Sequence, residues 1–194
     1  MIVKNEENFV WYAVSSVIDF VDEIMIWDQG SMDKTIEIIK TIESPKISLK
    51  KVTESVHALR EMMLEETSGD WIFILDGDEI WFQSAIENLK FKIENFNCDA
   101  VVVPNYMLIG DIFHYQEKSA GRYKIGDKVG HYNIRAIRKT DGLHIEGTYP
   151  NEAYVTKEGV KVQNLNKERI LFLETPYLHA SFLKRSSKDD KKVK

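Results

Sequence analysis

Short apolar runs alternate with stretches of helical periodicity along the first half of the chain. The runs of strand length lie at residues 2–3, 23–27, 46–52, 71–75 and 100–104. Between them, apolar side chains recur at helical spacing over residues 6–20, 32–43, 55–67 and 83–95. Strands that alternate with helices in this way predict an α/β fold, in which helices cover both faces of a mostly parallel central sheet.

The pattern changes after Pro104. Residues 107–130 are polar and contain several glycines, which predicts loops and a mobile segment. Residues 131–139 alternate like a strand, and residues 152–156 and 169–174 are further strand candidates. We therefore expect a more irregular, β-containing second half of one domain. Residues 184–194 carry six bases and two acids without periodicity, so we expect a solvated charged tail, with weak contact to anionic phosphate or lipid as the alternative.

Composition narrows the classes of protein to consider. The chain has 194 residues, of which 43% are hydrophobic and 29% charged, enough for a sizeable core. The net charge of -5 argues against a broad nucleic-acid-binding surface. A single cysteine excludes an internal disulfide. No apolar run reaches the ~18 residues of an integral membrane segment. The opening MIVKNEE does not fit a signal peptide. We expect a cytoplasmic protein. Peripheral contact with a membrane, through a partner or through the tail, stays an alternative.

Two carboxylates, Asp76 and Asp78, follow the apolar run WIFIL directly, and Glu79 comes next. Close like charges at the end of a buried strand repel one another, and their desolvation is costly. A divalent cation removes this conflict, and carboxylate oxygens suit Mg²⁺ or Mn²⁺. The alternative is a solvated acidic turn or a helix start with acids in its first turn. Parallel sheets bind ligands beyond the carboxyl ends of their strands, so these acids lie where a ligand is expected, and both interpretations stay open.

Two other strand ends carry candidate binding residues. In DQGSMDKT, residues 28–35, Gly30 permits a tight turn, and either Ser31 or Asp33 can cap the next helix. Asp28 could accept hydrogen bonds from a base edge or a ribose, although an ordinary strand–turn–helix corner has the same residues. In KNEE, residues 4–7, Asn5 and Glu6 fit either a helix start or a ligand contact.

Taken together, these motifs resemble family 2 glycosyltransferases of the GT-A fold, in the nucleotide-diphospho-sugar transferase superfamily. The resemblance is carried by MIVKNEE, by DQGSMDKT and by ALREMMLEETSGDWIFILDGDE, and it covers residues 1 to about 80. Arg60 stands nine residues before Gly69, the usual spacing, although Glu61 replaces the common Asn. The family has a Rossmann-like GT-A sheet, so the resemblance agrees with the fold expected from periodicity.

The resemblance implies roles for particular residues. It implies a nucleotide-sugar site that contains Val3, Asn5, Glu6, Asp28, Gly30, Ser31, Arg60, Asp76 and Gly77. Asp78 of the D-x-D motif would ligate Mn²⁺ or Mg²⁺, with Asp76 near the ribose and the metal. His179 would complete the metal site or contact the diphosphate; the alternative is an ordinary core or surface histidine. Gln29 replaces an Asp that reads the base in many relatives, so a UDP-sugar donor is expected but not secured.

The second half carries a weaker likeness. NIRAIRKTDGLHIEGTYPNEAYV has the layout of an arginine-bearing strand followed by a G-R-x-H-E-like motif. Glu152 falls at the acid of that motif, while Asn151 replaces its histidine. By this likeness Glu152 is the general base. Glu146 is the local rival, and a surface acid beside a strand is the alternative to both.

The resemblance thus implies an inverting, metal-dependent transfer of a sugar to a hydroxyl of a carbohydrate, lipid-linked or protein acceptor. Residues 1–106 would bind the nucleotide-sugar, residues 107–183 the acceptor, and residues 184–194 form the tail. The alternative is a non-catalytic nucleotide-sugar-binding module. A sugar-1-phosphate nucleotidyltransferase would need a glycine-rich basic loop where KNEE stands. An aspartyl-phosphate phosphatase would carry its nucleophile on the first strand, whereas Asp76 follows at least three.

Overall fold

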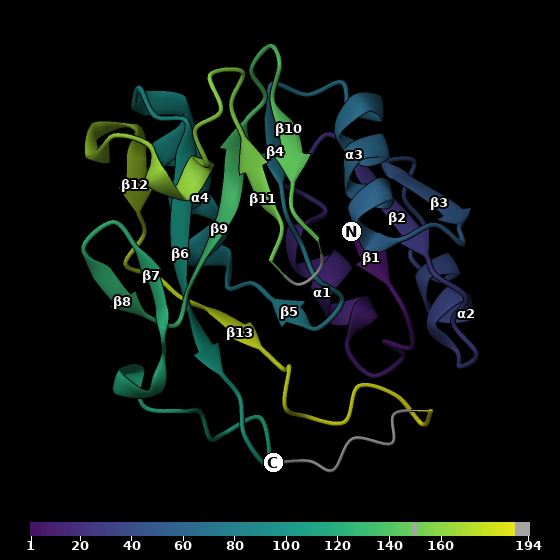
Figure 1. The fold of residues 1–194 in the computed structure, drawn as a ribbon. Coiled ribbons are helices and arrows are strands. Elements are labelled where there is room, and N and C mark those ends of the chain that lie inside the picture. The colour runs from purple at the N-terminus through teal and green to yellow at the C-terminus, as the bar shows by residue number, and fades with distance from the viewer. Residues whose placement is uncertain (149–150, 189–194) are drawn as a thin grey trace.

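Two main sheets, two hairpins and the covering helices make up the structure, a computed structural model that describes residues 1–148 and 151–188 (Figure 1). The first sheet is parallel and has the order β1-β2-β3. Its strands are β1 (Ile2–Val3), β2 (Ile24–Asp28) and β3 (Ile47–Lys51). The helices that alternate with them are α1 (Val10–Val17), α2 (Thr35–Lys40) and α3 (Val56–Glu66). This half has the parallel α/β organisation that the periodicity predicts.

The second sheet is mixed and has the order β4-β9-β6-β13-β5, with β12 also paired to β6. Its strands are β4 (Trp71–Phe73), β5 (Glu79–Ile80), β6 (Ala100–Met107), β9 (Tyr132–Arg138), β12 (Ile170–Phe172) and β13 (Tyr177–His179). β6 is parallel to β12 and β13, whereas β4·β9, β6·β9 and β5·β13 are antiparallel. The α/β fold class is therefore confirmed, with the parallel pairs divided between two sheets.

The chain between β9 and β13, and that between β6 and β9, is irregular as expected. Residues 107–130 also contain a hairpin, where we expected only loops; it consists of β7 (Tyr123–Ile125) and β8 (Lys128–Gly130). A second hairpin pairs β10 (His144–Glu146) with β11 (Ala153–Val155). The remaining elements are α4 (Gln83–Asn95) and the 3-10 turns η1 (Lys118–Ala120), η2 (Val162–Asn164) and η3 (Lys167–Arg169).

One hydrophobic core joins the two sheets. Val10, Val14 and Val17 lie on one face of α1 at helical spacing and are fully buried. They belong to the same cluster as Ile26 of β2 and Val101 of β6. Burial of this continuous apolar surface fixes the orientation of one sheet relative to the other, and with it the strand ends that carry the polar motifs.

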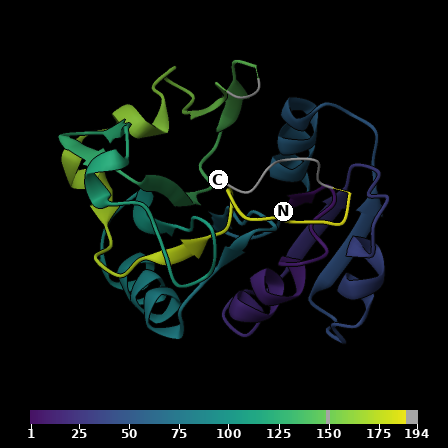
Figure 2. The ribbon, with the colours of Figure 1, turned by 90° about the horizontal axis from the view of Figure 1, so that it is seen from below.

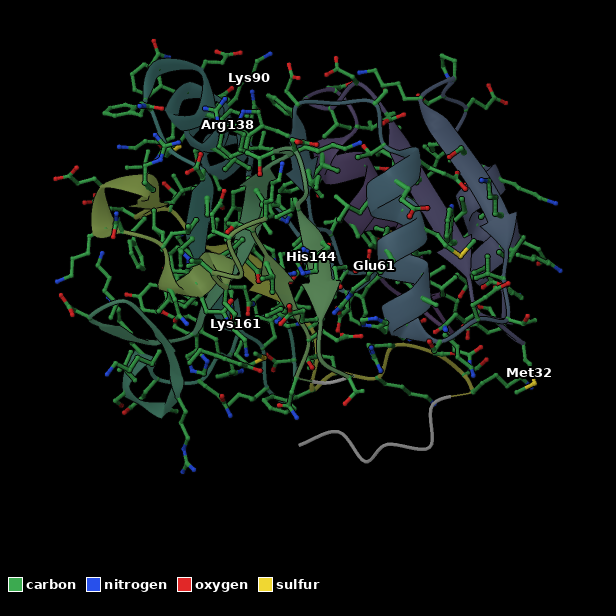
Figure 3. All side chains as sticks on the ribbon, turned by 45° about the horizontal axis from the view of Figure 1, so that its top comes forward. Met32, Glu61, Lys90, Arg138, His144 and Lys161 are labelled. Carbon is green, nitrogen blue, oxygen red and sulfur yellow. The ribbon has the colours of Figure 1, made fainter. Side chains whose placement is uncertain are left out.

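The hairpin β10–β11 is held against α3. Figure 3 shows Glu61 on α3 directed toward the strand that carries His144. The Glu61 carboxylate accepts a hydrogen bond from the backbone N–H of Ile145 in β10. The second hairpin is thereby attached to the half of the chain that carries the DQGSMDKT and KNEE motifs.

Within residues 1–148 and 151–188, none of the helices is long and apolar enough to cross a membrane.

Candidate functional site

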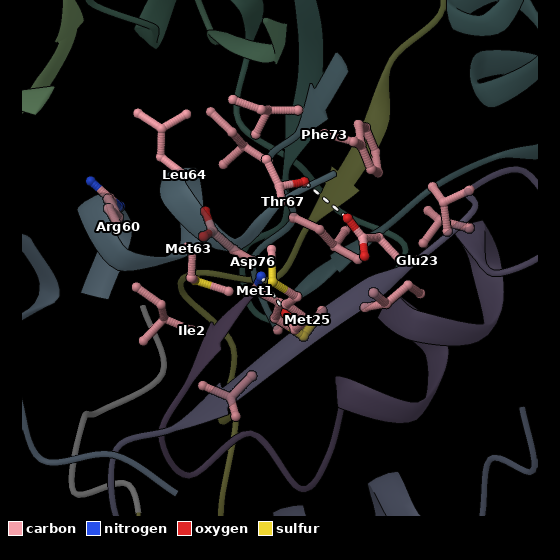
Figure 4. A pocket seen from close by; sticks show the side chains of 18 of the residues that line it. Met1, Ile2, Glu23, Met25, Arg60, Met63, Leu64, Thr67, Phe73 and Asp76 are labelled. Carbon is pink, nitrogen blue, oxygen red and sulfur yellow. Dashed lines mark hydrogen bonds between the residues drawn. The ribbon is translucent and has the colours of Figure 1, made fainter. Parts of the chain in front are cut away.

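A cavity of about 760 Å³ lies where the two sheets approach each other. β1 is the edge of the first sheet and β4 the edge of the second, and residues of both strands line it. Figure 4 shows Arg60 and Asp76 on this cavity beside the apolar side chains of Met63 and Leu64. Several residues that the sequence singled out line it together: Val3, Glu6, Arg60, Asp76, Gly77, Asp78 and His179.

The acidic motif forms a tight turn between β4 and β5. The backbone N–H of Glu79 donates to the carbonyl oxygen of Asp76 at 3.2 Å. Gly77 lies so close to Glu6 that a Cβ at this position would stand 2.8 Å from the Glu6 Cγ. The absence of a side chain at Gly77 therefore permits the acidic motif of residues 76–79 to contact the KNEE motif of residues 4–7. Asp76 is half exposed, with 43% of its side chain accessible, whereas 4% of the Asp78 side chain is accessible.

His179 meets this turn from the far end of the chain. Strand β13 pairs antiparallel with β5, which sets His179 opposite Glu79. The Nε2 of His179 is 3.6 Å from Oδ1 of Asp78. Burial alone would lower the pKa of His179, but the Asp78 carboxylate outweighs burial and raises that pKa above its ordinary value. The ring nitrogen Nδ1 is buried and, among the described residues, has no hydrogen-bond partner.

This pair suits part of a metal site. A carboxylate oxygen and an imidazole nitrogen are both common metal donors, and the Nδ1 atom of His179 is not committed to another described group. Within the described residues, however, no three His, Cys, Asp or Glu side chains gather closely enough to hold a metal by themselves. The donor set fits a cation that takes further oxygen ligands from water or a phosphate, as Mg²⁺ and Mn²⁺ do.

Residues 184–188 differ from the solvated tail that the sequence suggested. Figure 2 shows the C-terminal segment crossing from β13 to the N-terminal elements. Asn8 donates hydrogen bonds to the carbonyl oxygens of Lys184, at 2.8 Å, and Arg185, at 3.0 Å. The Arg185 guanidinium lies 2.8 Å from Oε1 of Glu6 and 3.7 Å from Oδ2 of Asp78. A cation from the tail therefore stands among the site acids; residues 189–194 of the expected tail lie outside the described part of the chain.

The same segment is docked on the DQGSMDKT loop. Ser186 is fully buried, and its hydroxyl donates to Oδ2 of Asp33 at 2.5 Å. Burial alone would raise the pKa of Asp33, but hydrogen bonds from Ser186 and Thr35 outweigh it and hold that pKa below its ordinary value. Asp33 thus acts as an ionised anchor that connects the start of α2 to the end of the described chain.

The Asp28 corner has the contacts of a well-formed turn. The carboxylate of Asp28 is fully buried and accepts hydrogen bonds from the backbone N–H groups of Gly30 and Ser31 at 3.1 to 3.2 Å. Gly30 adopts a φ of 78°, which glycine does at no steric cost. A ribose contact by Asp28 stays a prediction. Asn5 does not cap α1, because its Oδ1 accepts the N–H of Met32 while its own N–H donates to Ser31.

The side chain of Glu152 is buried rather than exposed to solvent. It forms an ion pair with Arg60, and 2% of its side chain is accessible, so the interpretation as a surface acid is wrong. Its second oxygen, Oε1, has no hydrogen-bond partner among the described residues. Glu146, the rival, is 56% exposed and lies 3.2 Å from Nε2 of His144. Neither acid lines the cavity, and the role of each as a base stays a prediction.

Arg135 is the site residue that the sequence did not single out. It lies on β9 with 8% of its side chain accessible and contacts both Asp76 and Glu79. Its signal in the sequence was a cation inside the alternating strand HYNIRAIRK, at a position that faces the interior. Trp81, which follows the acidic turn, is 3% exposed and stacks on Tyr177 inside the core.

Comparisons with known proteins identify the family to which the chain belongs. Residues 1–149 match the family described as glycosyl transferase family 2. The SPbeta prophage-derived glycosyltransferase SunS of Bacillus subtilis is 29% identical over 109 residues, which is 54% of this chain and 26% of that protein. The chain spans about a quarter of this curated relative's length.

Solved structures share the fold at low sequence identity. S. aureus TarS 1-349 in complex with UDP-GlcNAc superposes with a TM-score of 0.63 at 13% identity, covering 91% of this chain and 56% of that TarS fragment. The mannosyltransferase PcManGT from Pyrobaculum calidifontis, in complex with GDP-Man and Mn²⁺, has a TM-score of 0.58 at 15% identity, covering 98% of this chain and 56% of that protein. The GT-A likeness inferred from the motifs is thereby confirmed.

Proposed function

The chain belongs to glycosyl transferase family 2, and on this basis we propose that it transfers a sugar from a nucleotide-diphosphate donor to an acceptor hydroxyl with inversion at the anomeric carbon. We propose UDP as the nucleotide, residues 1–106 as the donor side and residues 107–183 as the acceptor side. The TarS complex with UDP-GlcNAc supports this choice of donor, while the GDP-Man complex of PcManGT keeps GDP as a test case.

One observation carries the proposal. Asp78 and His179 come from distant parts of the chain and lie 3.6 Å apart on a cavity that Glu6 and Arg60 also line. Structural needs alone do not favour such an arrangement, because burying several ionisable groups together is costly. A nucleotide diphosphate with its cation would meet acids, a histidine and an arginine in one place. The cavity at the ends of β1 and β4 also has the position at which α/β sheets bind ligands.

In this proposal the chain's own residues bind and orient the donor. Asp78 and His179 would hold Mn²⁺ or Mg²⁺, and Asp76 would lie near the ribose and the metal. When bound, the metal would stabilise the negative charge that develops on the leaving diphosphate. Arg185 would exchange its contact with Asp78 for the diphosphate, because a cation beside these acids competes with the metal for the same carboxylate.

A carboxylate base completes the proposed reaction. The base takes the proton of the acceptor hydroxyl, the acceptor oxygen bonds to the anomeric carbon, and the bond to the diphosphate oxygen breaks with its electron pair leaving on the diphosphate. We propose Glu152 for this role. Its unpartnered Oε1 supports the assignment, since one oxygen can hold Arg60 while the other accepts a proton.

The burial of Glu152 favours a second candidate function. An acid with 2% of its side chain accessible, paired to Arg60, has no open path to an acceptor in this conformation. The same residues would then serve a nucleotide-sugar-binding module without transfer. The two candidates share the donor site and differ in whether a bound donor is consumed.

Calorimetric titration of UDP-sugars and GDP-sugars, with and without Mn²⁺, tests the proposal together with a transfer and hydrolysis assay. We expect Mn²⁺-dependent binding of a UDP-sugar that Asp78→Asn abolishes, while the matched control Asp70→Asn in the chain segment before β4 binds as the wild type does. Thermal unfolding of both variants checks that each is folded. Binding without turnover would favour the binding module, and absence of binding by the wild type would overturn the proposal.

A further inference from the structure

A buried arginine holds the two acids that flank the tip of the acidic turn. Nη2 of Arg135 donates to Oδ2 of Asp76 at 3.0 Å and also to the carboxylate of Glu79. The Glu79 side chain is fully buried, whereas Asp76 is open to the cavity. The backbone N–H of Asp76 further donates to Oε2 of Glu79 at 3.4 Å. Asp78 therefore sits in a turn whose first and last residues share a single guanidinium nitrogen.

The guanidinium is itself oriented from the opposite side. Nε of Arg135 donates to the hydroxyl oxygen of Tyr177 at 3.1 Å, and Nδ2 of Asn133 donates to the same oxygen at 2.7 Å. The Tyr177 ring stacks on Trp81 with the ring centroids 4.8 Å apart. Tyr177 lies on β13 two residues before His179. One hydrogen-bonded chain thus connects the acidic turn to the strand that carries His179.

Stability does not account for this cluster. Burying an arginine with two carboxylates costs desolvation energy that their attraction offsets only when the geometry is good, and apolar replacements of such clusters are often as stable or more so. The fixed planar fork of arginine can instead hold several acceptors in one geometry, which the point charge of lysine cannot do. The arrangement suits a requirement for position rather than for folding energy.

We propose that Arg135 is a positioning residue: oriented by the Tyr177 hydroxyl, it sets Asp76, and through the turn Asp78, at the spacing from His179 that the metal and the donor diphosphate require. The proposal rests on the proposed function, because it concerns the same donor site. It assigns no contact between Arg135 and the donor. Loss of the orientation should weaken the cooperation between metal and nucleotide more than it weakens the nucleotide contact itself.

The test uses Tyr177→Phe, which retains the stacked ring and removes only the hydroxyl, together with Arg135→Lys. The matched control is Arg138→Lys on the same strand, whose guanidinium contacts the carbonyl oxygen of Cys98 and the Asp99 carboxylate, away from the turn. UDP affinity is measured by calorimetry without metal and with saturating Mn²⁺, and Mn²⁺ binding is measured separately by electron paramagnetic resonance. Thermal unfolding reports whether each variant is folded.

We expect Tyr177→Phe to remain folded. The ratio of its UDP affinity with Mn²⁺ to that without Mn²⁺ should be about tenfold smaller than in the wild type, while the metal-free UDP affinity changes less than twofold. Arg135→Lys should lose more, and Arg138→Lys should match the wild type. Equal losses with and without Mn²⁺ would indicate a merely structural role and overturn the inference, as would a Tyr177→Phe protein indistinguishable from the wild type. A wild type that binds neither UDP nor Mn²⁺ would overturn the proposed function, and this inference with it.

Discussion

The carboxylate of Asp78 and the imidazole of His179 lie 3.6 Å apart because a three-residue strand near the end of the chain pairs with a two-residue strand that follows the acidic turn. β6 makes this contact possible. It continues through Pro104 to Met107 and pairs in parallel with β13, so that Met107 stands opposite His179. Residues that are distant in sequence thereby reach one site through a continuous ladder of backbone hydrogen bonds.

Replacing His179 by alanine should remove one of two protein ligands from the proposed metal site. We expect Mn²⁺-dependent UDP binding to weaken about 10- to 100-fold, the range seen when support of a metal site is lost, with metal-free UDP binding little changed. Calorimetry with and without Mn²⁺ measures both quantities. His144→Ala is the control, since His144 is 42% exposed and pairs with Glu146. Unchanged Mn²⁺ dependence in His179→Ala would remove this residue from the metal site.

The stability of the metal-free protein should depend on pH through the same histidine. The pKa of His179 is raised in the folded protein above the ordinary 6.5, so its ion pair with Asp78 contributes stability that is fully present below about 6.5 and is lost as the pH rises through the folded value. Mn²⁺ affinity should change in the opposite direction, because a ligating imidazole must be neutral.

Denaturant unfolding of the wild type and of His179→Asn at several pH values isolates this contribution. The stability difference between the two proteins should shrink as the pH rises above 6.5. His114→Asn serves as the comparison, because His114 pairs with Asp111 in the exposed loop before η1 and this exposed pair should change the pH profile less than His179→Asn does. A difference that stays constant across this range, or grows with pH, would contradict the sign derived from the Asp78 contact.

Gly77 should tolerate no side chain without movement of Glu6. A Cβ would stand 2.8 Å from Cγ and 3.1 Å from Cβ of Glu6. Because such overpacking typically costs 1–3 kcal/mol, we expect Gly77→Ala to reduce the free energy of unfolding by roughly that amount and to weaken donor binding. Gly69→Ala is the control, since its nearest contact would be an ordinary 3.4 Å. Equal stability of the two variants in chemical denaturation would show that Glu6 moves aside freely.

The elements that the sequence predicts well are those long enough to show their period. Helices α3 and α4 and strands β2 and β3 were expected within a few residues of their observed bounds. Strands β5, β10 and β13 were not expected, because two or three residues carry too little alternation to be recognised. The apolar run that predicts β6 ends at Pro104, where the sequence becomes polar, yet the observed strand continues to Met107.

The candidate site divides in the same way. The acids of residues 76–79 could be located because strand ends in a parallel sheet bind ligands, a rule that needs only local sequence. Arg135 could not, because it is one of three cations in the run HYNIRAIRK, and only its partners Asp76 and Glu79 distinguish it from the other two. The docking of Ser186 on Asp33 likewise depends on a contact between the two ends of the chain. Long-range pairing, not composition, decides these positions.

The assignment of Glu152 as general base can be tested against its own environment. Glu152→Gln keeps the shape of the side chain and its contact with Arg60 but removes the charge that would accept the acceptor's proton. Since general bases typically contribute 10²–10⁴-fold, we expect kcat to fall by about that factor while the dissociation constant of the donor changes only a few-fold. Arg60→Gln separates the loss of the base from the loss of donor binding: it should weaken donor binding, because Arg60 lines the cavity and Glu152 does not.

Glu146→Gln is the matched control, because Glu146 is exposed and paired with His144. Loss of activity in Glu146→Gln with full activity in Glu152→Gln would move the base to β10. Full activity in both variants would show that neither is the base, whereas a wild type that binds donor without turnover would favour the binding module, in which the Arg60–Glu152 pair only anchors β11 to α3.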